Sequence, residues 1–347
     1  MAIAASGTVS AADIRTEYGL SGEVSFADLY RGGSYVRAKA ANNNGTNLAA
    51  SVPTSGTLTF DNFRGTAKAF KYTFTGGATN QNASTLFGDD YAVNYPKEII
   101  INAGVELGAT STSEEALEIP SGGAGSITIT NNGTLSGAGG AAGGGTGGDA
   151  FEAAVACILV NNGTIRAGGG GGGAGGTGGQ GSYSAVTYTF QNHVTYMAVY
   201  AFGCRPLVGG YYRGSHVSHS NAYGSVCPNG YGYYVGSMVY NSKYKLGYSV
   251  TSYTSGGSGG SGGKGQGYVS GNASGSGGSG GGTNAGQGGQ GGVGGTYGNS
   301  GSTGSTGVSG NYTGGSGGSS GGAAGKYIRG ISFVTYTNNG SNLGGTA

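Results

Sequence analysis

The chain has 347 residues, 84 of them glycine, and its formal net charge of +2 conceals an uneven distribution. Residues 1–152 carry 8 basic and 14 acidic side chains, whereas residues 153–347 carry 8 basic side chains and no aspartate or glutamate. A stretch without carboxylates cannot supply the acid and base of a glycosidase, a hard-cation site or the acid of a Ser-His-Asp triad. We therefore expect no enzymatic activity, no catalytic residues, no cofactor and no metal site.

The amino terminus, MAIAASGTVSAADIRTEYG, has no basic head followed by an apolar stretch. It does not read as a signal peptide, and no segment approaches the length of a transmembrane helix. The sequence therefore predicts a protein that is made and folded in the cytoplasm.

A nine-residue repeat marks the first part of the chain, at residues 7–15, 22–30 and 56–64. Each copy has a Ser or Thr three residues before an Asp or Asn, at Ser10 and Asp13, Ser25 and Asp28, and Thr59 and Asn62. This spacing resembles a capping box and predicts three short capped helical turns. We expect Ile14, Leu29 and Phe63 to share a small core within a module of residues 1–68; the alternative is three unrelated surface turns.

Residues 69–122 are expected to form a β connector, because apolar and polar residues alternate with the period of half-buried strands. The same alternation continues at residues 127–129. The string NNGT recurs at 131–134 and 161–164, with NNGS at 338–341. We expect tight turns there, with Asn-Gly supplying positive φ values. These strings also match glycosylation sequons, but the turn interpretation is favoured.

Glycine blocks begin at residues 137, 167, 256, 277 and 314, and much of their sequence is GGX with a period of three. That period fits an extended helix of the polyproline II type, which rises about 3.1 Å per residue. Collagen is excluded because proline-rich G-X-Y repeats are missing. Since glycine is costly to order, only a laterally bonded bundle would persist. Residues 123–347 are thus expected to form a polyglycine-type domain.

A tyrosine-rich insertion, residues 182–254, interrupts the glycine blocks and holds 14 of the 25 tyrosines. Its length is typical of a functional segment, and Tyr and Arg are enriched where binding energy concentrates. The candidate receptor-binding residues are Tyr211, Tyr212, Arg213, Tyr231, Tyr233, Tyr234, Lys243, Tyr244 and Lys245. Alternatively, about half of the tyrosines form the insertion's own small core. Shorter intervals, at Tyr268 and at residues 297–312, are expected to emerge beside the insertion.

Cysteine and histidine give weaker signals. His216 and His219 with Cys204 and Cys227 match no zinc spacing. A Cys204–Cys227 disulfide stays open, and Cys157 is expected to be a core residue. The apolar segments that begin at Phe151 and Tyr327 are expected to return to the base of the bundle and give it a packed foot.

Two resemblances extend this interpretation. Segments such as SFADLYRGGSYV and TFDNFRGTAK resemble modules in structural proteins of tailed-bacteriophage virions. The alternation of glycine blocks with other segments resembles the receptor-binding adhesins at the long-tail-fibre tips of T-even-type phages. That resemblance implies a sandwich of polyglycine helices displaying variable loops at its far end. The amino-terminal part does not resemble that of these adhesins, so a fibre subunit with its own attachment module and a separate cap are both open.

The expected fold is therefore mainly β and irregular, with a small helical-turn module, a β segment and a polyglycine-II-like bundle carrying the insertion. The expected function is receptor binding at a virion tail. The expected partners are other tail proteins and a bacterial surface receptor, which is either a lipopolysaccharide glycan or an outer-membrane protein. Both a homotrimer and a single cap are open. The alternatives are a purely structural virion subunit, an ice-binding protein and a depolymerase. Nucleic acid is not an expected partner, because four basic residues across the insertion are sparse for that task.

Overall fold

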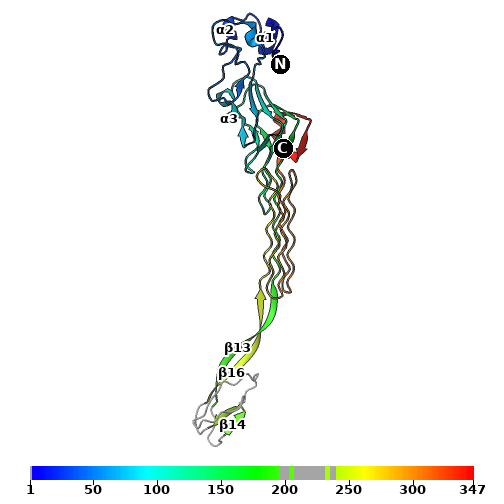
Figure 1. The fold of residues 1–347 in the computed structure, drawn as a ribbon. Helices are drawn as coiled ribbons and strands as arrows, with labels where there is room; N and C mark the ends of the chain where they lie inside the picture. Colours follow the sequence, from blue (N-terminus) through cyan, green and yellow to red (C-terminus); the bar gives the residue numbers. More distant parts are fainter. Residues whose placement is uncertain (1, 196–202, 207–230, 235–239) are drawn as a thin grey trace.

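The computed structural model describes residues 2–195, 203–206, 231–234 and 240–347, and only the backbone of the parts that lie within residues 187–248. The molecule is elongated (Figure 1): the amino-terminal module lies at one end, followed by a body of β-sheet, a bundle of extended glycine-rich segments and a long β-ribbon. The carboxyl terminus lies in the β body. This arrangement is mainly β, as the sequence predicts.

Short helices organise the amino-terminal module: α1 (Ala11–Tyr18), α2 (Phe26–Leu29) and the 3-10 turn η1 (Phe60–Phe63). All three begin with the predicted capping box, so the repeats are confirmed as helix starts. In the first copy, the Asp13 backbone N–H donates to Ser10 Oγ, and the Ser10 N–H donates to Asp13 Oδ2 at 2.8 Å. The local sequence therefore fixes where each turn starts.

The core of this module contains Ile14 and Phe63, both buried, as predicted. Leu29 packs against that core but stays half-buried. Tyr18 lies edge-on to Phe63 with ring centroids 5.7 Å apart, and its hydroxyl donates to Thr66 Oγ1 at 2.9 Å. The three repeats thus share one small core rather than forming separate surface turns.

Three sheets of parallel strands form the body. The first contains β2 (Phe70–Phe74), β5 (Lys97–Ile101), β8 (Ile127–Asn131), β11 (Cys157–Asn161) and β18 (Val334–Asn338), with β1 (Thr46–Asn47) antiparallel to β2. The second contains β3 (Ala78–Thr79), β6 (Glu106–Gly108), β9 (Thr134–Ser136), β12 (Thr164–Arg166) and β19 (Ser341–Leu343). The third contains β4 (Gln81–Asn82), β7 (Leu117–Ile119), β10 (Phe151–Ala153), β17 (Lys326–Arg329) and β20 (Gly345–Thr346).

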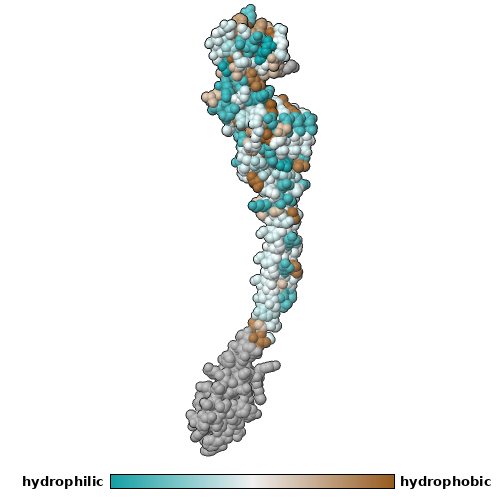
Figure 2. Space-filling model, in the orientation of Figure 1, coloured by the Kyte–Doolittle hydropathy of each residue, from teal (hydrophilic) through white to brown (hydrophobic). Residues whose placement is uncertain are grey.

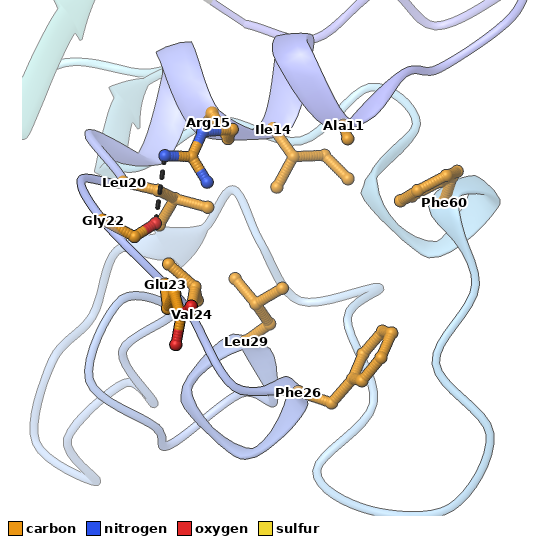
Figure 3. Close-up of a pocket in the computed structure, with 10 residues that line it drawn as sticks. All are labelled: Ala11, Ile14, Arg15, Leu20, Gly22, Glu23, Val24, Phe26, Leu29 and Phe60. Carbon is orange, nitrogen blue, oxygen red and sulfur yellow. Dashed lines mark hydrogen bonds between the residues drawn. The ribbon is translucent and has the colours of Figure 1, made fainter.

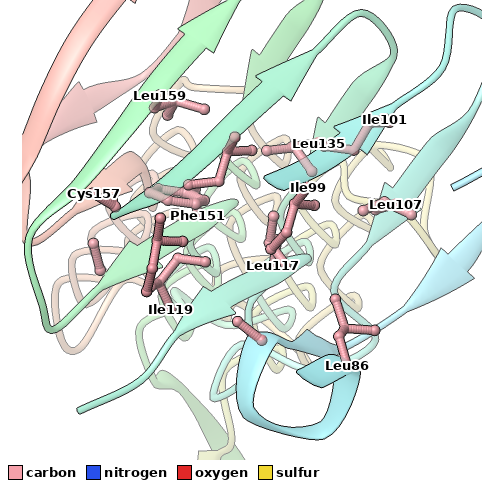
Figure 4. Packing of buried hydrophobic residues seen from close by; sticks show 14 of the residues in the cluster. Leu86, Ile99, Ile101, Leu107, Leu117, Ile119, Leu135, Phe151, Cys157 and Leu159 are labelled. Atoms are coloured by element: carbon pink, nitrogen blue, oxygen red, sulfur yellow. The ribbon is translucent and has the colours of Figure 1, made fainter. Parts of the chain in front are cut away.

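The chain visits these sheets in rotation, so the body is a parallel β-helix of five coils. Inward side chains such as Ile99, Leu117, Leu135 and Phe151 stack from coil to coil in one buried core (Figure 4). Cys157 belongs to that core, as predicted. The boundary expected at residue 122 falls between two coils of these continuous sheets. Short elements complete the body: α3 (Ala83–Phe87), η2 (Gly88–Asp90) and η3 (Ile331–Phe333).

The NNGT and NNGS strings are corners of the β-helix between the first and second sheets. The expected positive φ was wrong, because Gly133, Gly163 and Gly340 are not among the residues with positive φ. Glycine is required there by close stacking: a Cβ on Gly163 would overlap the carbonyl oxygen of Gly133, and one on Gly340 would overlap that of Gly163. The asparagines form ladders instead, with Asn131 Nδ2 donating to Asn161 Oδ1 at 2.8 Å.

Two insertions leave the β-helix on its way from the second sheet to the third: residues 137–150 in the third coil and residues 167–325 in the fourth. The second insertion forms most of the glycine bundle, in which extended segments run side by side along the long axis. Because the apolar segments after Phe151 and Tyr327 form strands of the β-helix, the predicted packed foot of the bundle is confirmed.

Hydrogen bonds in the bundle repeat every third residue. The N–H groups of Gly172, Gly175 and Gly178 donate to the carbonyls of Gly263, Gly260 and Gly257 at 2.8 Å. The N–H groups of the following residues, Gly173, Gly176 and Gly179, donate to a different neighbour, at Ser302, Ser305 and Val308. Each extended segment is therefore bonded sideways to several others.

Beyond the bundle, β13 (Gly181–Thr195) and β16 (Tyr240–Thr254) pair antiparallel as a long ribbon. A second, shorter ribbon pairs β14 (Gly203–Pro206) with β15 (Tyr231–Tyr234). The ribbons lie at the end of the molecule opposite the amino-terminal module (Figure 1). The tyrosine-rich insertion is thus carried at the distal end.

Candidate functional site

Six of the nine predicted binding residues lie on strands of the distal ribbons. Tyr231, Tyr233 and Tyr234 belong to β15, in register with Pro206, Cys204 and Gly203 of β14. Lys243, Tyr244 and Lys245 belong to β16, in register with Asn192, Gln191 and Phe190. The other three, Tyr211, Tyr212 and Arg213, lie outside the described residues, as do His216, His219 and Cys227. The Cys204–Cys227 disulfide therefore stays a prediction.

The base of the long ribbon is fixed to the end of the bundle by asparagine side chains. The Ser182 N–H donates to Asn311 Oδ1 at 2.7 Å, and Asn311 Nδ2 donates to the Ser182 carbonyl at 2.9 Å. Asn284, which has a positive φ of 57°, also donates to that carbonyl, at 3.0 Å. Turns from two other bundle segments therefore hold the first residues of the ribbon in place.

An exposed aromatic pair lies at this junction. The rings of Tyr253, on β16, and Tyr312, on a bundle turn, have centroids 4.6 Å apart, and their residues are 57% and 55% exposed. The hydrogen bond to Tyr312 raises the pKa of Tyr253. Exposed Val186 and Val250 add an apolar patch where the bundle meets the ribbon (Figure 2). Tyr312, which lies between two glycine blocks, thus emerges beside the insertion, as predicted.

Tyr268 and Tyr297, in the shorter segments between the later glycine blocks, were predicted wrongly, because they lie at the opposite end of the bundle. The Tyr297 ring lies 4.0 Å from the Arg166 guanidinium carbon, on the second sheet. Arg166 also pairs with Glu106 at 2.8 Å. Tyr268 packs so closely on Gly108 that a Cβ there would overlap its ring. Both tyrosines therefore join the bundle to the β-helix. The glycine segments are interrupted by turns at both ends of the bundle, so a tyrosine in a turn can lie at either end.

A second cluster ties the bundle to the third sheet. Arg329 pairs with Glu115, with Asp149 at 3.3 Å and with Glu152 at 2.5 Å. Burial raises the pKa of Glu115 to about 7, against the lowering effect of Arg329. This cluster, together with Arg166 and Glu106, neutralises two of the eight basic residues of the second half of the chain.

At the other end of the molecule, the three repeats surround a cup of about 590 Å³, whose lining is mostly apolar but includes Arg15 and Glu23 (Figure 3). The residue after the capping Ser or Thr comes to the rim in every copy, as Ala11, Phe26 and Phe60. Ile14 and Leu29 form its floor. An adjoining hollow of about 380 Å³ reaches Phe63. Phe26 is 68% exposed and Phe60 is 52% exposed, which is unusual for phenylalanine unless a partner covers it.

Sequence reasoning found the repeats but missed the cup. The signal was present, since Phe26 and Phe60 occupy the same repeat position and face outward from their capped turns. A position that is apolar in the repeat yet exposed in the helix indicates a shared external surface rather than a core.

The described residues contain no group of three His, Cys, Asp or Glu side chains placed to hold a metal ion. Within the same part of the chain, no helix has the length and apolarity needed to cross a membrane.

The described part of the chain thus has an apolar-lined cup at one end and β-ribbons at the other. The family described as phage tail fibre adhesin Gp38 matches residues 69–242, half of the chain, and the chain belongs to that family. It is thus a tail-fibre adhesin of a phage virion and mediates adsorption to the bacterial host.

One solved structure is similar: the gp37–gp38 adhesin tip complex of the long tail fibre of bacteriophage S16. The similarity has 19% sequence identity and a TM-score of 0.38, and it covers 99% of this chain and 100% of the other. No curated protein sequence matches the chain.

Proposed function

We propose that the adhesin seats on its fibre through the apolar cup and binds the host through the insertion of residues 182–254. The observation that carries this proposal is the separation of the two surfaces to opposite ends of one elongated molecule (Figure 1). An adhesin needs one end for the virion and one for the cell, and the glycine bundle lies between them.

The partner at the cup is proposed to be a tail-fibre subunit with a three-fold symmetric, apolar end. Three related repeats place one capped turn each around one hollow, with Ala11, Phe26 and Phe60 at the same repeat position. A trimeric fibre end offers three equivalent contacts of its own, which one copy of the adhesin would satisfy. This matching favours a single cap over the homotrimer that the sequence left open.

The bundle is proposed to be of the polyglycine II type and to act as a stiff spacer. Two observations support this: the hydrogen bonds repeat every third residue, and consecutive N–H groups point to different neighbours. Because the segments are cross-linked by backbone hydrogen bonds, bending would break many of them together. The ribbon is therefore held away from the β-helix.

The host receptor is proposed to contact the nine predicted residues Tyr211, Tyr212, Arg213, Tyr231, Tyr233, Tyr234, Lys243, Tyr244 and Lys245. Tyrosine offers a large, rigid, amphipathic surface at low entropic cost. The basic residues have no carboxylate in their own half of the chain, since every Asp and Glu lies at or before residue 152. Their charge is available to the phosphates and acidic sugars of lipopolysaccharide, which we favour over an outer-membrane protein.

Cell-binding measurements with cluster variants of the full chain test this assignment. The variants are Tyr231→Ser with Tyr233→Ser and Tyr234→Ser, and Lys243→Ser with Lys245→Ser; Lys264→Ser, on the bundle, is the matched control. We expect both cluster variants to lose at least tenfold in affinity for host cells, and the control to bind as wild type does. Wild-type affinity in both cluster variants would refute the assignment.

Two arms separate the receptor classes. Cells with truncated lipopolysaccharide glycans should lose binding, whereas protease-treated cells should keep it. The opposite pattern would show a protein receptor. Enzymatic activity is not part of the proposal, because the carboxylates lie at the other end of the molecule from the insertion.

A further inference from the structure

A second pocket, of about 510 Å³, lies where the amino-terminal module meets the first sheet. Arg31, which lines it, directly follows the second repeat, and Thr54 lies two residues before the third. Thr46 and Asn47 of the lining form β1, at the edge of the first sheet. The pocket therefore adjoins the repeats that surround the cup, although the two hollows share no lining residue. The rest of the lining is Ala38, Lys39, Gly45 and Ala50.

The Arg31 side chain has no partner among the described residues. Its Nε is buried and lacks a hydrogen-bond acceptor, and the same part of the chain supplies no ion pair to the guanidinium. A buried donor without an acceptor is costly, and arginine cannot lose its proton to avoid that cost. We therefore expect the acceptor to come from a ligand. The other arginines whose side chains are described all donate to carbonyl or carboxylate oxygens: Arg15, Arg37, Arg64, Arg166 and Arg329.

The lining of this pocket offers donors and no acid. Lys39 is a second cation; its Nζ donates to the Asn43 carbonyl at 2.7 Å, and an ammonium has two further donors. Thr46 and Thr54 are exposed and add hydroxyl groups. No Asp or Glu is among the lining residues. Because a guanidinium presents two N–H groups side by side, it matches the paired oxygens of a carboxylate or phosphate. The pocket is therefore suited to an oxyanion.

The size and the position of the pocket indicate what carries the oxyanion. Its volume lies in the range of pockets that enclose ligands of many atoms, and a free phosphate would leave most of it to water. The amino-terminal module lies at the end of the molecule opposite the distal ribbons (Figure 1). A virion protein is therefore favoured as the carrier over the host surface, and the oxyanion of an unmodified protein side chain is a carboxylate.

We propose that this pocket receives an aspartate or glutamate side chain of the tail-fibre subunit on which the adhesin seats. The inference rests on the proposed attachment through the cup and adds a charged contact to an apolar one. Apolar contacts are non-directional, whereas an arginine and a carboxylate pair in a fixed geometry. The ion pair would therefore fix the orientation of the adhesin on the end of the fibre.

Binding of the full chain to virions produced without adhesin tests the pairing, with bound adhesin per virion measured against its concentration. Arg31→Gln should bind at least tenfold more weakly, because the partner's carboxylate loses its cation. Arg31→Lys keeps the charge but not the two parallel donors and should lie between this variant and wild type. Lys264→Gln removes one charge from an exposed position of the bundle and should bind as wild type does.

Thermal unfolding separates binding from a structural role. Since Arg31 has no partner within the described chain, Arg31→Gln should unfold at the wild-type temperature; a lower temperature would show an internal role and overturn the proposal. Normal virion binding by Arg31→Gln would overturn it too. If inorganic phosphate, at constant ionic strength, nevertheless stabilises the wild type alone, the ligand is a free anion and not the fibre.

Phe60→Ser, on the rim of the cup, distinguishes failure of this inference from failure of the proposed attachment. Loss of virion binding by Phe60→Ser alone would keep the cup and refute the carboxylate site. Loss by Arg31→Gln alone would support the carboxylate site and refute the cup. Normal binding by both variants would refute both.

Discussion

Gly173 lies against the carbonyl oxygen of Ser319 so closely that a Cβ on Gly173 would overlap that oxygen. The neighbours of Gly173 in its own segment meet other segments in the same way, since a Cβ on Gly172 would overlap the carbonyl of Gly292. The GGX pattern is therefore a steric requirement: two residues of every three face another backbone, and only the third has room for a side chain.

Gly173→Ala should destabilise the bundle by about 1–3 kcal/mol, because the backbone of a neighbouring segment must move. Gly317→Ala is the matched control, since nothing lies within 4 Å of its Cβ position and its φ is not positive. The control should be neutral or stabilising by up to about 1 kcal/mol, as alanine restricts the unfolded chain. Denaturant titration with hydrogen exchange of the bundle measures both. Equal losses in the two variants would contradict the packing described here.

The cup gives a prediction on assembly. Phe60→Ser should abolish incorporation of the adhesin into virions, because it removes an exposed apolar contact on the docking surface. Its thermal unfolding should change little, as an exposed side chain contributes little to the core. Val269→Ser, at a 61% exposed position of the bundle, should assemble normally. Virions of the Phe60 variant that carry normal amounts of adhesin would exclude the cup as the attachment surface.

Asp90 joins the segment between the second and third amino-terminal repeats to the β-helix. Its buried carboxylate accepts from Arg37 Nε at 2.9 Å, the Ala40 N–H at 2.7 Å and Asn43 Nδ2 at 3.0 Å. Burial pushes the pKa of Asp90 up, but the bonds from Asn43, Ala40 and Arg37 outweigh it and hold the pKa below its usual value. The stability that Asp90 provides is therefore present at neutral pH and is lost as the pH falls through the lowered pKa.

Asp90→Asn should cost about 1–3 kcal/mol, since a buried acceptor of three bonds is replaced by an amide. Hydrogen exchange should rise first in residues 37–47. The control Asp89→Asn removes the exposed neighbouring charge but keeps the Oδ1 that accepts from Asn42 Nδ2 at 3.0 Å, so exchange there should stay unaltered. Unchanged protection in the Asp90 variant would show that this joint contributes nothing.

Glu115 gives the opposite pH dependence. Because burial raises its pKa to about 7, the folded chain binds this proton more tightly than the unfolded chain does between the ordinary value and about 7. The free energy of unfolding should therefore fall as the pH rises through this window. Between pH 5 and pH 8, the free energy of unfolding of the wild type should fall by about 1–3 kcal/mol more than that of Glu115→Gln, which lacks the titrating group. Glu114→Gln, exposed and adjacent, should retain the wild-type slope; a parallel slope in both variants would refute the assignment.

Local features of the fold could be predicted from the sequence, and long-range ones could not. Ser10 and Asp13 lie in one turn, so their spacing predicted a capping box that the structure contains. The period of three in the glycine blocks likewise predicted extended segments. The β-helix was not foreseen, because its strands have two to five residues and pair with strands far away in the sequence. Asn161, for example, is hydrogen-bonded to Asn338, and most of the glycine bundle lies between them in the sequence.

The same limit applies to the functional surfaces. Composition indicated the distal insertion, because tyrosine is concentrated there without carboxylates. Which of the later tyrosines would join it depended on the direction of each bundle segment, so Tyr312 was predicted correctly and Tyr297 was not. The pocket beside Arg31 could not be recognised, because its lining residues are separated in the sequence and only the fold brings them together.

The receptor-binding role of the insertion is tested by adsorption with the full chain in which residues 183–253 are replaced by a short Gly-Ser link. Gly181 and Thr254 are paired across the ribbon, so the link closes the end of the bundle without straining it. We expect the intact chain to bind host cells saturably and to block phage adsorption, and the replaced chain, with its bundle still protease-resistant, to do neither. If the replaced chain blocks adsorption as well as the intact one, the insertion is not the receptor-binding site.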